Sequence, residues 1–162
     1  MRHAKAEPTG PSDHERALAR RGHEEAAEAG RWLAAQGVRP DAALVSDALR
    51  TRETWDEVAG GAGWDVVPEV SHALYVAGSD TAFDLVREVD ADVVTLVLVG
   101  HNPTMAYAAE LLDDGEGDQE ASTAMVTRGF PTSAVSVFEV SCPWADVGPG
   151  SGRLEAFHVP QP

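Results

Sequence analysis

Three short segments of the sequence carry a histidine, an arginine or both. The segments are Arg-His-Ala-Lys at residues 2–5, Ser-Asp-Ala-Leu-Arg at residues 46–50 and Gly-His-Asn-Pro at residues 100–103. A neutral imidazole can attack as a nucleophile or exchange a proton near pH 7, and the planar guanidinium binds oxyanions through two parallel hydrogen bonds. Together the three segments predict a small, locally positive site for an anionic group.

Several common catalytic and cofactor motifs are absent from the sequence. There is no G-x-x-x-x-G-K-[ST] loop, no G-x-G-x-x-G turn, no G-x-S-x-G elbow and no H-E-x-x-H helix. Cys142 is the single cysteine, so the chain can form no internal disulfide and offers no thiol cluster for zinc.

The composition limits the class of protein. A length of 162 residues with 43% hydrophobic content predicts one domain, residues 1–162. The net charge of -15 argues against nucleic acid and anionic membranes as partners. No apolar run is long enough to span a membrane and no signal peptide is evident, so we expect a cytoplasmic protein that acts as a monomer.

Apolar patterning predicts the elements that position these three segments. We expect helices over residues 12–37, 47–58 and 80–89, and a helix that follows Pro103 with Asn102 as its cap. Strands are expected at residues 42–46, 64–68 and 93–99, with two late, antiparallel strands at residues 133–140 and 153–159. This alternation predicts an α/β fold, a three-layer α/β/α sandwich whose mostly parallel sheet has helices on both faces.

The second and third polar segments follow predicted strands directly. Ligands of open α/β sheets gather outside the carboxyl ends of the strands, so these segments are expected to meet. Taken singly, each residue has an ordinary interpretation: a frayed terminus for His3, a surface helix for Arg50, a capped helix end for His101. The joint pattern favours a site, whereas His14, His23, His72 and His158 fit no pattern and are interpreted as surface or strand residues.

The chain resembles the histidine phosphatase superfamily, which has Arg-His near its N-terminus, then Ser-x-x-x-Arg and a later Gly-His. Further similarity is to its SixA branch of phosphohistidine phosphatases. It comes from the Arg-His-Ala-Lys opening, Arg-Ala-Leu at residues 16–18 with Arg-Gly at residues 21–22, and Phe-Pro-Thr-Ser-Ala at residues 130–134. The resemblance covers essentially the whole chain.

The resemblance implies a role for each residue. His3 is the nucleophile that becomes transiently phosphorylated, Arg2 and Arg50 bind the phosphoryl oxygens, and His101, protonated beside the dianion, stabilises the transition state. Arg16 is a further candidate for phosphate binding, although a solvated salt bridge fits it equally well. No metal or organic cofactor is required, and the expected substrate is a phosphorylated protein in signal transduction.

Two departures from the family pattern affect this interpretation. Larger members use a carboxylate as general acid, for which Glu69 is the nearest candidate by sequence order; the SixA branch lacks it, which favours the labile phosphoramidate bond over alkyl esters. The family also places a central strand before Arg-His, where this chain has only Met1. The expectation is a gap at the centre of the sheet, with a misassigned start and an upstream strand as one explanation.

Two alternative functions remain open. A phosphomonoesterase acting on small phosphate esters would use the same four residues, although the short chain leaves little room for a substrate-recognition cap. A non-catalytic module that binds phosphoproteins would keep the anion site without the attack by His3.

Overall fold

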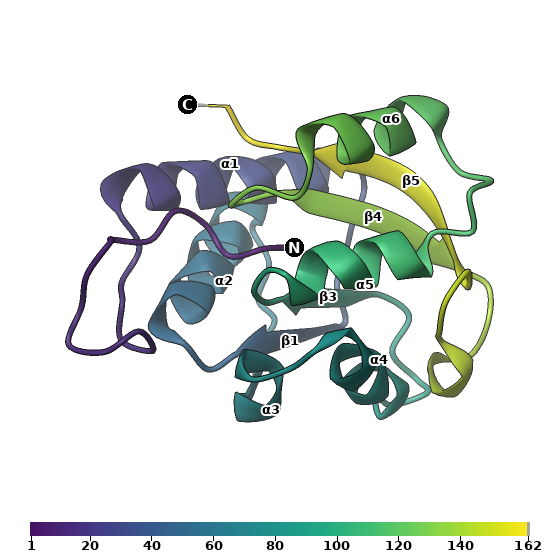
Figure 1. Ribbon diagram of the computed structural model, residues 1–162, viewed down its shortest axis with the longest axis horizontal. Helices are drawn as coiled ribbons and strands as arrows, with labels where there is room; N and C mark the ends of the chain where they lie inside the picture. The colour runs from purple at the N-terminus through teal and green to yellow at the C-terminus, as the bar shows by residue number, and fades with distance from the viewer. Residues whose placement is uncertain (162) are drawn as a thin grey trace.

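The computed structural model describes residues 1–161, in which helices and strands alternate along the chain (Figure 1). Its elements, in order, are α1 (Arg20–Ala35), β1 (Ala42–Ser46), α2 (Leu49–Ala62), β2 (Glu69–Ser71), α3 (His72–Tyr75), α4 (Ser79–Arg87), β3 (Leu96–Val99), α5 (Thr104–Leu112), α6 (Gln119–Arg128), β4 (Val135–Val140), a 3-10 turn (Trp144–Asp146) and β5 (Gly152–His158). No helix among these residues is both long and apolar enough to cross a membrane.

Three parallel strands form the sheet that carries the functional segments. Their order is β2-β1-β3, and the register pairs Val45 of β1 with Val99 of β3. The carboxyl ends of β1 and β3 therefore lie side by side, at the points where the second and third polar segments begin. A separate antiparallel pair is formed by β4 and β5.

Side chains of the parallel strands alternate between two helical layers. Ala43 and Val45 pack with Trp55 of α2 on one face, whereas Leu44 packs with Met105 of α5 and with residues of α4 on the other. Strands buried on both faces explain the continuous apolar sequences of β1 and β3. The predicted α/β architecture, a parallel sheet flanked by helices, is confirmed.

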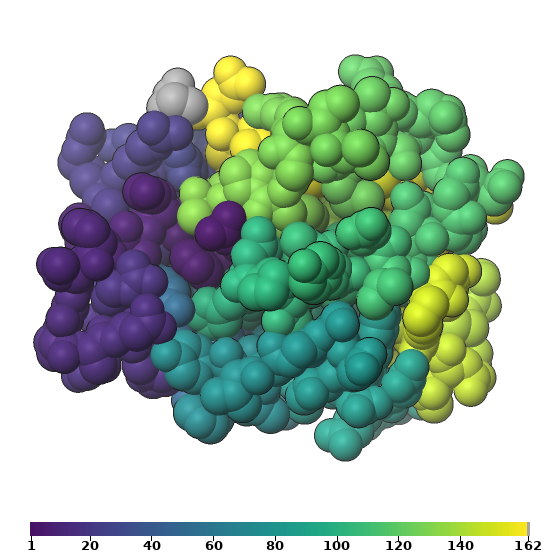
Figure 2. Space-filling view, in the orientation of Figure 1, coloured from purple at the N-terminus to yellow at the C-terminus, as the bar shows by residue number. Residues whose placement is uncertain are grey.

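The first residues of the chain lie between β3 and β4, in the middle of the molecule (Figures 1 and 2). The sequence analysis expected the central strand before Arg2 to be missing. At this place the structure has a single parallel bridge, between Arg2 and Gly100. Beyond it, an apolar cavity of about 680 Å³ extends between β3 and β4, with Met1 in its wall. The predicted gap in the sheet is present, yet His3 itself is buried and hydrogen-bonded instead of loose.

Several predicted boundaries were wrong. Strand β3 begins at Leu96 instead of residue 93, and the cap position of α5 is Pro103, not Asn102. Helix α1 begins at Arg20, not near residue 12, because the preceding segment folds back over the carboxyl end of the sheet. Gly60 and Gly61 lie inside α2, which ends at Gly63 in the left-handed conformation that glycine tolerates. The strand expected at residues 64–68 is instead β2, because only Glu69–Ser71 pair with β1.

Candidate active site

Backbone hydrogen bonds fix His3 at the end of the sheet. Its N–H donates to Gly100 O (2.9 Å), and its carbonyl accepts from Ser133 N (3.1 Å). The neighbouring Arg2 N–H donates to Ala134 O (3.0 Å). The segment Phe-Pro-Thr-Ser-Ala at residues 130–134 therefore supports the N-terminal residues from one side, and the end of β3 supports them from the other.

The His3 ring is oriented so that one nitrogen remains free. Its Nδ1 lies 2.8 Å from Ala4 O, and because a carbonyl only accepts hydrogen bonds, Nδ1 carries the proton. The other nitrogen, Nε2, then has an available lone pair. Burial lowers the pKa of the ring to about 4; the bond to Ala4 opposes the shift and the charge of Arg50 adds to it. At neutral pH the ring is uncharged, with the lone pair that a nucleophile needs.

Arg50 and His101 meet beside His3. The Arg50 guanidinium is buried, with NH2 3.3 Å from His101 Nδ1, and the His3 and His101 ring centroids are 5.2 Å apart. Since a guanidinium only donates, His101 Nδ1 is the acceptor, and Nε2–H donates to Ser46 Oγ at 2.7 Å. Burial, followed by the positive charges of its neighbours, lowers the pKa of His101 to about 3. Without a bound anion His101 is neutral.

Two arginines at the site keep buried N–H groups without hydrogen-bond partners. Arg2 NH1 donates to Phe130 O (3.1 Å), and Arg50 NH1 donates to Asp13 O (2.6 Å), but Nε of both side chains is buried and unpartnered among residues 1–161. Burial lowers the pKa of Arg2. Unsatisfied buried donors are costly unless a ligand accepts from them.

Asp13 and Tyr75 complete the rim of the site, and sequence reasoning did not identify either one. Asp13 Oδ2 accepts from Arg50 NH2 (3.1 Å) and from the Tyr75 hydroxyl (2.9 Å). The Tyr75 bond, followed by the charge of Arg50, lowers the pKa of Asp13 to about 2 despite partial burial. The same hydrogen bond raises the pKa of Tyr75. No sequence motif connects Asp13 with Tyr75, 62 positions away.

Arg16 and Glu69 occupy different positions from the four central residues. Arg16 is tied to Asp13 Oδ1 (3.0 Å) and to Glu7 O (2.9 Å), and its charge contributes only a minor part of the lowered pKa of His3. Glu69 is exposed at the start of β2, paired in register with Leu44, and makes no hydrogen bond to the site. The structure thus gives no support for Glu69 as a general acid.

Thr54 connects the N-terminal segment, residues 2–5, to Arg50. Its Oγ1 accepts from Ala4 N (2.9 Å) and donates to Arg50 O (2.6 Å), inside the protein. This threonine lies one helical turn after Arg50 on α2, so a single buried hydroxyl relates the positions of His3 and Arg50. Sequence reasoning missed it because an isolated threonine in a helix has no distinctive pattern.

Comparison with known proteins agrees with this geometry. The model of the histidine phosphatase superfamily (branch 1) matches residues 1–74. The protein named phosphohistidine phosphatase SixA from Agrobacterium tumefaciens is 31% identical, with 99% of this chain and 95% of that chain covered and a TM-score of 0.80. Its counterpart from Nakamurella multipartitia is 29% identical over 100% of this chain and 94% of that chain, with a TM-score of 0.86.

A third solved structure is that of the protein histidine phosphatase SixA in complex with tungstate. It is 26% identical to this chain, covers 99% of this chain and 94% of its own, and has a TM-score of 0.75. Full-length similarity in sequence and structure accompanies the convergence of Arg2, His3, Arg50 and His101 at one end of the sheet. The chain belongs to the histidine phosphatase superfamily.

Proposed function

We propose that this phosphatase removes the phosphoryl group from phosphohistidine in a protein through a covalent intermediate on His3. The observation that carries the proposal is a neutral, buried His3 with a free Nε2, close to Arg2 and Arg50, whose Nε–H groups are buried and unpartnered among residues 1–161. A tetrahedral oxyanion fits such a set of donors. Tungstate, which the related SixA structure contains, is an ion of this shape.

In the first step, His3 Nε2 attacks phosphorus while Arg2 and Arg50 neutralise the equatorial oxygens. A new N–P bond forms to His3 as the N–P bond to the substrate imidazole breaks. The electron pair of the broken bond stays with the leaving imidazole, which departs with its own ring proton. Positioning and electrostatic stabilisation supply most of what phosphoryl transfer requires.

In the second step, water attacks the phosphorus of phospho-His3, inorganic phosphate leaves and His3 is regenerated. His101 Nδ1 faces Arg50 with a lone pair in the free site. A phosphoryl dianion between these groups raises the pKa of His101, so that Nδ1 gains a proton and donates to a phosphoryl oxygen. Ser46 holds the opposite edge of the ring through its 2.7 Å hydrogen bond.

The ionisation state of Asp13, the carboxylate that hydrogen-bonds to Arg50, favours a phosphoramidate substrate. Asp13, which contacts Arg50, has a pKa lowered to about 2 and is ionised at neutral pH, so it is a poor proton donor. An alkoxide leaving group needs such a donor, whereas a protonated imidazole does not. We therefore expect alkyl phosphates to be much poorer substrates than phosphohistidine.

The test compares a phosphohistidine-bearing protein with a simple alkyl phosphate, using wild type and His3→Ala. We expect rapid release of phosphate from the phosphohistidine protein only, with loss of activity in His3→Ala. Rapid quenching should trap an acid-labile, base-stable phosphoryl group on His3. Equal turnover of the alkyl phosphate would contradict the proposed specificity, and retention of activity in His3→Ala would contradict the nucleophile.

The same experiment separates the two alternative functions. A phosphomonoesterase for small esters would turn over the alkyl phosphate through His3 and would not require a protein substrate. A binding module would release no phosphate, and its His3→Ala variant would still bind the phosphoprotein. Binding is measured by calorimetry with a non-hydrolysable phosphohistidine analogue in a peptide.

A further inference from the structure

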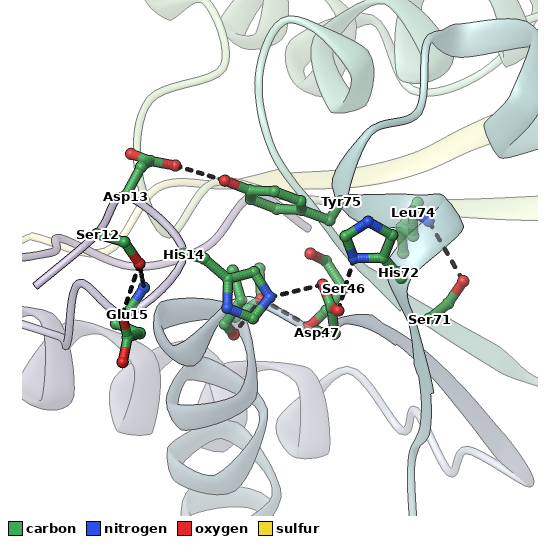
Figure 3. Close-up of polar contacts among 12 residues, drawn as sticks. Ser12, Asp13, His14, Glu15, Ser46, Asp47, Ser71, His72, Leu74 and Tyr75 are labelled. Carbon is green, nitrogen blue, oxygen red and sulfur yellow. Dashed lines mark hydrogen bonds and ion pairs between the residues drawn. The ribbon is translucent and has the colours of Figure 1, made fainter.

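Two histidines and an aspartate gather at the rim of the site, although they are distant in sequence (Figure 3). His14 comes from the segment before α1, Asp47 follows β1 directly, and His72 begins α3. One potential ligand atom of each residue lies within 4.8 Å of the other two. The proposed phosphatase chemistry uses none of the three, and no spacing pattern in the sequence groups them.

Backbone contacts position these three residues before any ligand binds. Asp47 N donates to Ser71 O at 3.2 Å, which places β1 beside the start of α3, and Leu49 N donates to His14 O at 2.9 Å. The His14 ring also packs edge-on against Tyr75, with 5.0 Å between the ring centroids. The cluster is therefore a fixed feature of three converging segments.

Both histidine rings face the Asp47 carboxylate, each toward a different oxygen. His72 Nδ1 lies 2.8 Å from Asp47 Oδ2, and His14 Nε2 lies 3.0 Å from Asp47 Oδ1. His14 Nε2 and Asp47 Oδ1 are shielded from solvent and face each other as a potential ion pair, without the alignment of a hydrogen bond. A divalent cation that binds both rings and the carboxylate would take the place of the protons that otherwise join them.

We propose that His14, Asp47 and His72 form a binding site for a divalent first-row transition metal ion such as Zn²⁺. Zn²⁺ binds histidine nitrogen and carboxylate oxygen at about 2.0–2.2 Å, which puts tetrahedral ligands about 3.4 Å apart. The observed separations of 2.8 and 3.0 Å reach that spacing through small side-chain rotations. His72 is 68% exposed, so water can complete the coordination.

The electrostatic setting favours a cation at this position. The chain carries a formal net charge of -15, which attracts divalent cations to its surface. A bound ion would join the segment before α1 to α3 next to the phosphoryl site, because Asp47 adjoins Ser46, the partner of His101. None of the three proposed metal ligands belongs to the residues proposed to contact the phosphoryl group.

The test is calorimetric titration of untagged, chelator-treated protein with ZnCl₂, together with the visible absorption spectrum after Co²⁺ loading. We expect one ion per chain in the wild type, and at least tenfold weaker binding with loss of the Co²⁺ bands in His72→Ala and in Asp47→Asn. His72 is exposed, so its replacement leaves the fold intact, which circular dichroism of the metal-free proteins checks.

Two variants serve as matched controls. His23 also pairs with a carboxylate, Glu57 at 2.9 Å, but belongs to no cluster of three, so His23→Ala should bind the ion as the wild type does. His101→Ala tests whether the ion instead occupies the catalytic histidine pair, and it should also bind normally. Absence of stoichiometric binding, or binding that is lost with His101 or His23 and kept without His72, would overturn the proposal.

Discussion

Acidification from about pH 7 to about pH 5 should leave most His3 rings neutral. A histidine with an ordinary pKa of 6.5 is only about 3% neutral at pH 5, whereas a ring whose pKa is about 4 is about 90% neutral. Because the nucleophile must be neutral to attack, kcat/KM corrected for substrate ionisation should change little over this interval. An unshifted ring would instead lower kcat/KM about 25-fold.

Ring carbon-13 NMR of the free protein measures the same quantity directly. The His3 signal, assigned by its absence in His3→Ala, should titrate well below the histidine signals of the protein unfolded in denaturant. His101, with its pKa near 3, should titrate lower still or remain neutral throughout the accessible range. A His3 midpoint near 6.5 would refute the argument that burial and Arg50 keep this ring uncharged.

The lowered pKa of His3 also makes the free energy of unfolding depend on pH. Below pH 6.5 the unfolded chain protonates His3, while the folded chain resists protonation down to about pH 4. Stability is therefore present above pH 6.5 and is lost as the pH falls towards 4. By linkage, His3 alone reduces the free energy of unfolding by about 2 kcal/mol between pH 8 and pH 5. Denaturant unfolding of His3→Ala should show a correspondingly weaker pH dependence.

Three further variants test the packing around the site. Gly60→Ala should raise the free energy of unfolding by about 0.5–1 kcal/mol because its Cβ meets open space, whereas Gly61→Ala should lower it by about 1–3 kcal/mol because its Cβ would lie 2.3 Å from a carbonyl oxygen of α1; equal melting temperatures would contradict this. Thr54→Val leaves the Ala4 N–H without its acceptor, which costs about 1–3 kcal/mol and lowers kcat, and Thr54→Ser should restore both; wild-type stability and kcat in the valine variant would refute that role. Five valines added before Met1 should occupy the cavity between β3 and β4 and raise the melting temperature, at roughly 1.5–3 kcal/mol per fully buried side chain, whereas five serines should not; equal effects would show that the cavity does not accept a strand.

Elements with strong local patterns could be predicted from the sequence. The apolar, β-branched sequences of β1 and β3 predicted buried parallel strands, and the late pair β4 and β5 was expected to be antiparallel, as it is. Helix α6 was not predicted, because its polar sequence has no clear apolar stripe and follows an acidic loop. The start of α1 was misplaced because the segment before it folds back over the site, where Asp13 contacts Arg50.

Some residues of the candidate site could be predicted from the sequence, and others could not. Arg50 and His101 were predicted to converge because parallel strands bring their carboxyl ends together, whereas Arg2 and His3 were added by the family resemblance. The structure places His3 beside Arg50 and His101, with Arg2 bridged to Gly100. The rim could not be predicted, because its members come from loops whose paths depend on tertiary packing. Asp13 meets Tyr75, and Asp47 meets two histidines, without any spacing rule that relates them.

The unpartnered arginine nitrogens and the low histidine pKa values have a common cause. Arg50 is buried and Arg2 is half-buried beside His3 and His101, so the site holds positive charge in a poorly solvated place. Burial of each ring, and after it the charge of the arginines, lowers the pKa of both histidines and keeps them neutral. A phosphoryl dianion reverses this situation, because it accepts from the unpartnered donors and favours a proton on His101 while His3 Nε2 is engaged with phosphorus. On the proposed mechanism, the same groups that destabilise the site without an anion would support binding and transfer of a phosphoryl group, a trade of stability for function.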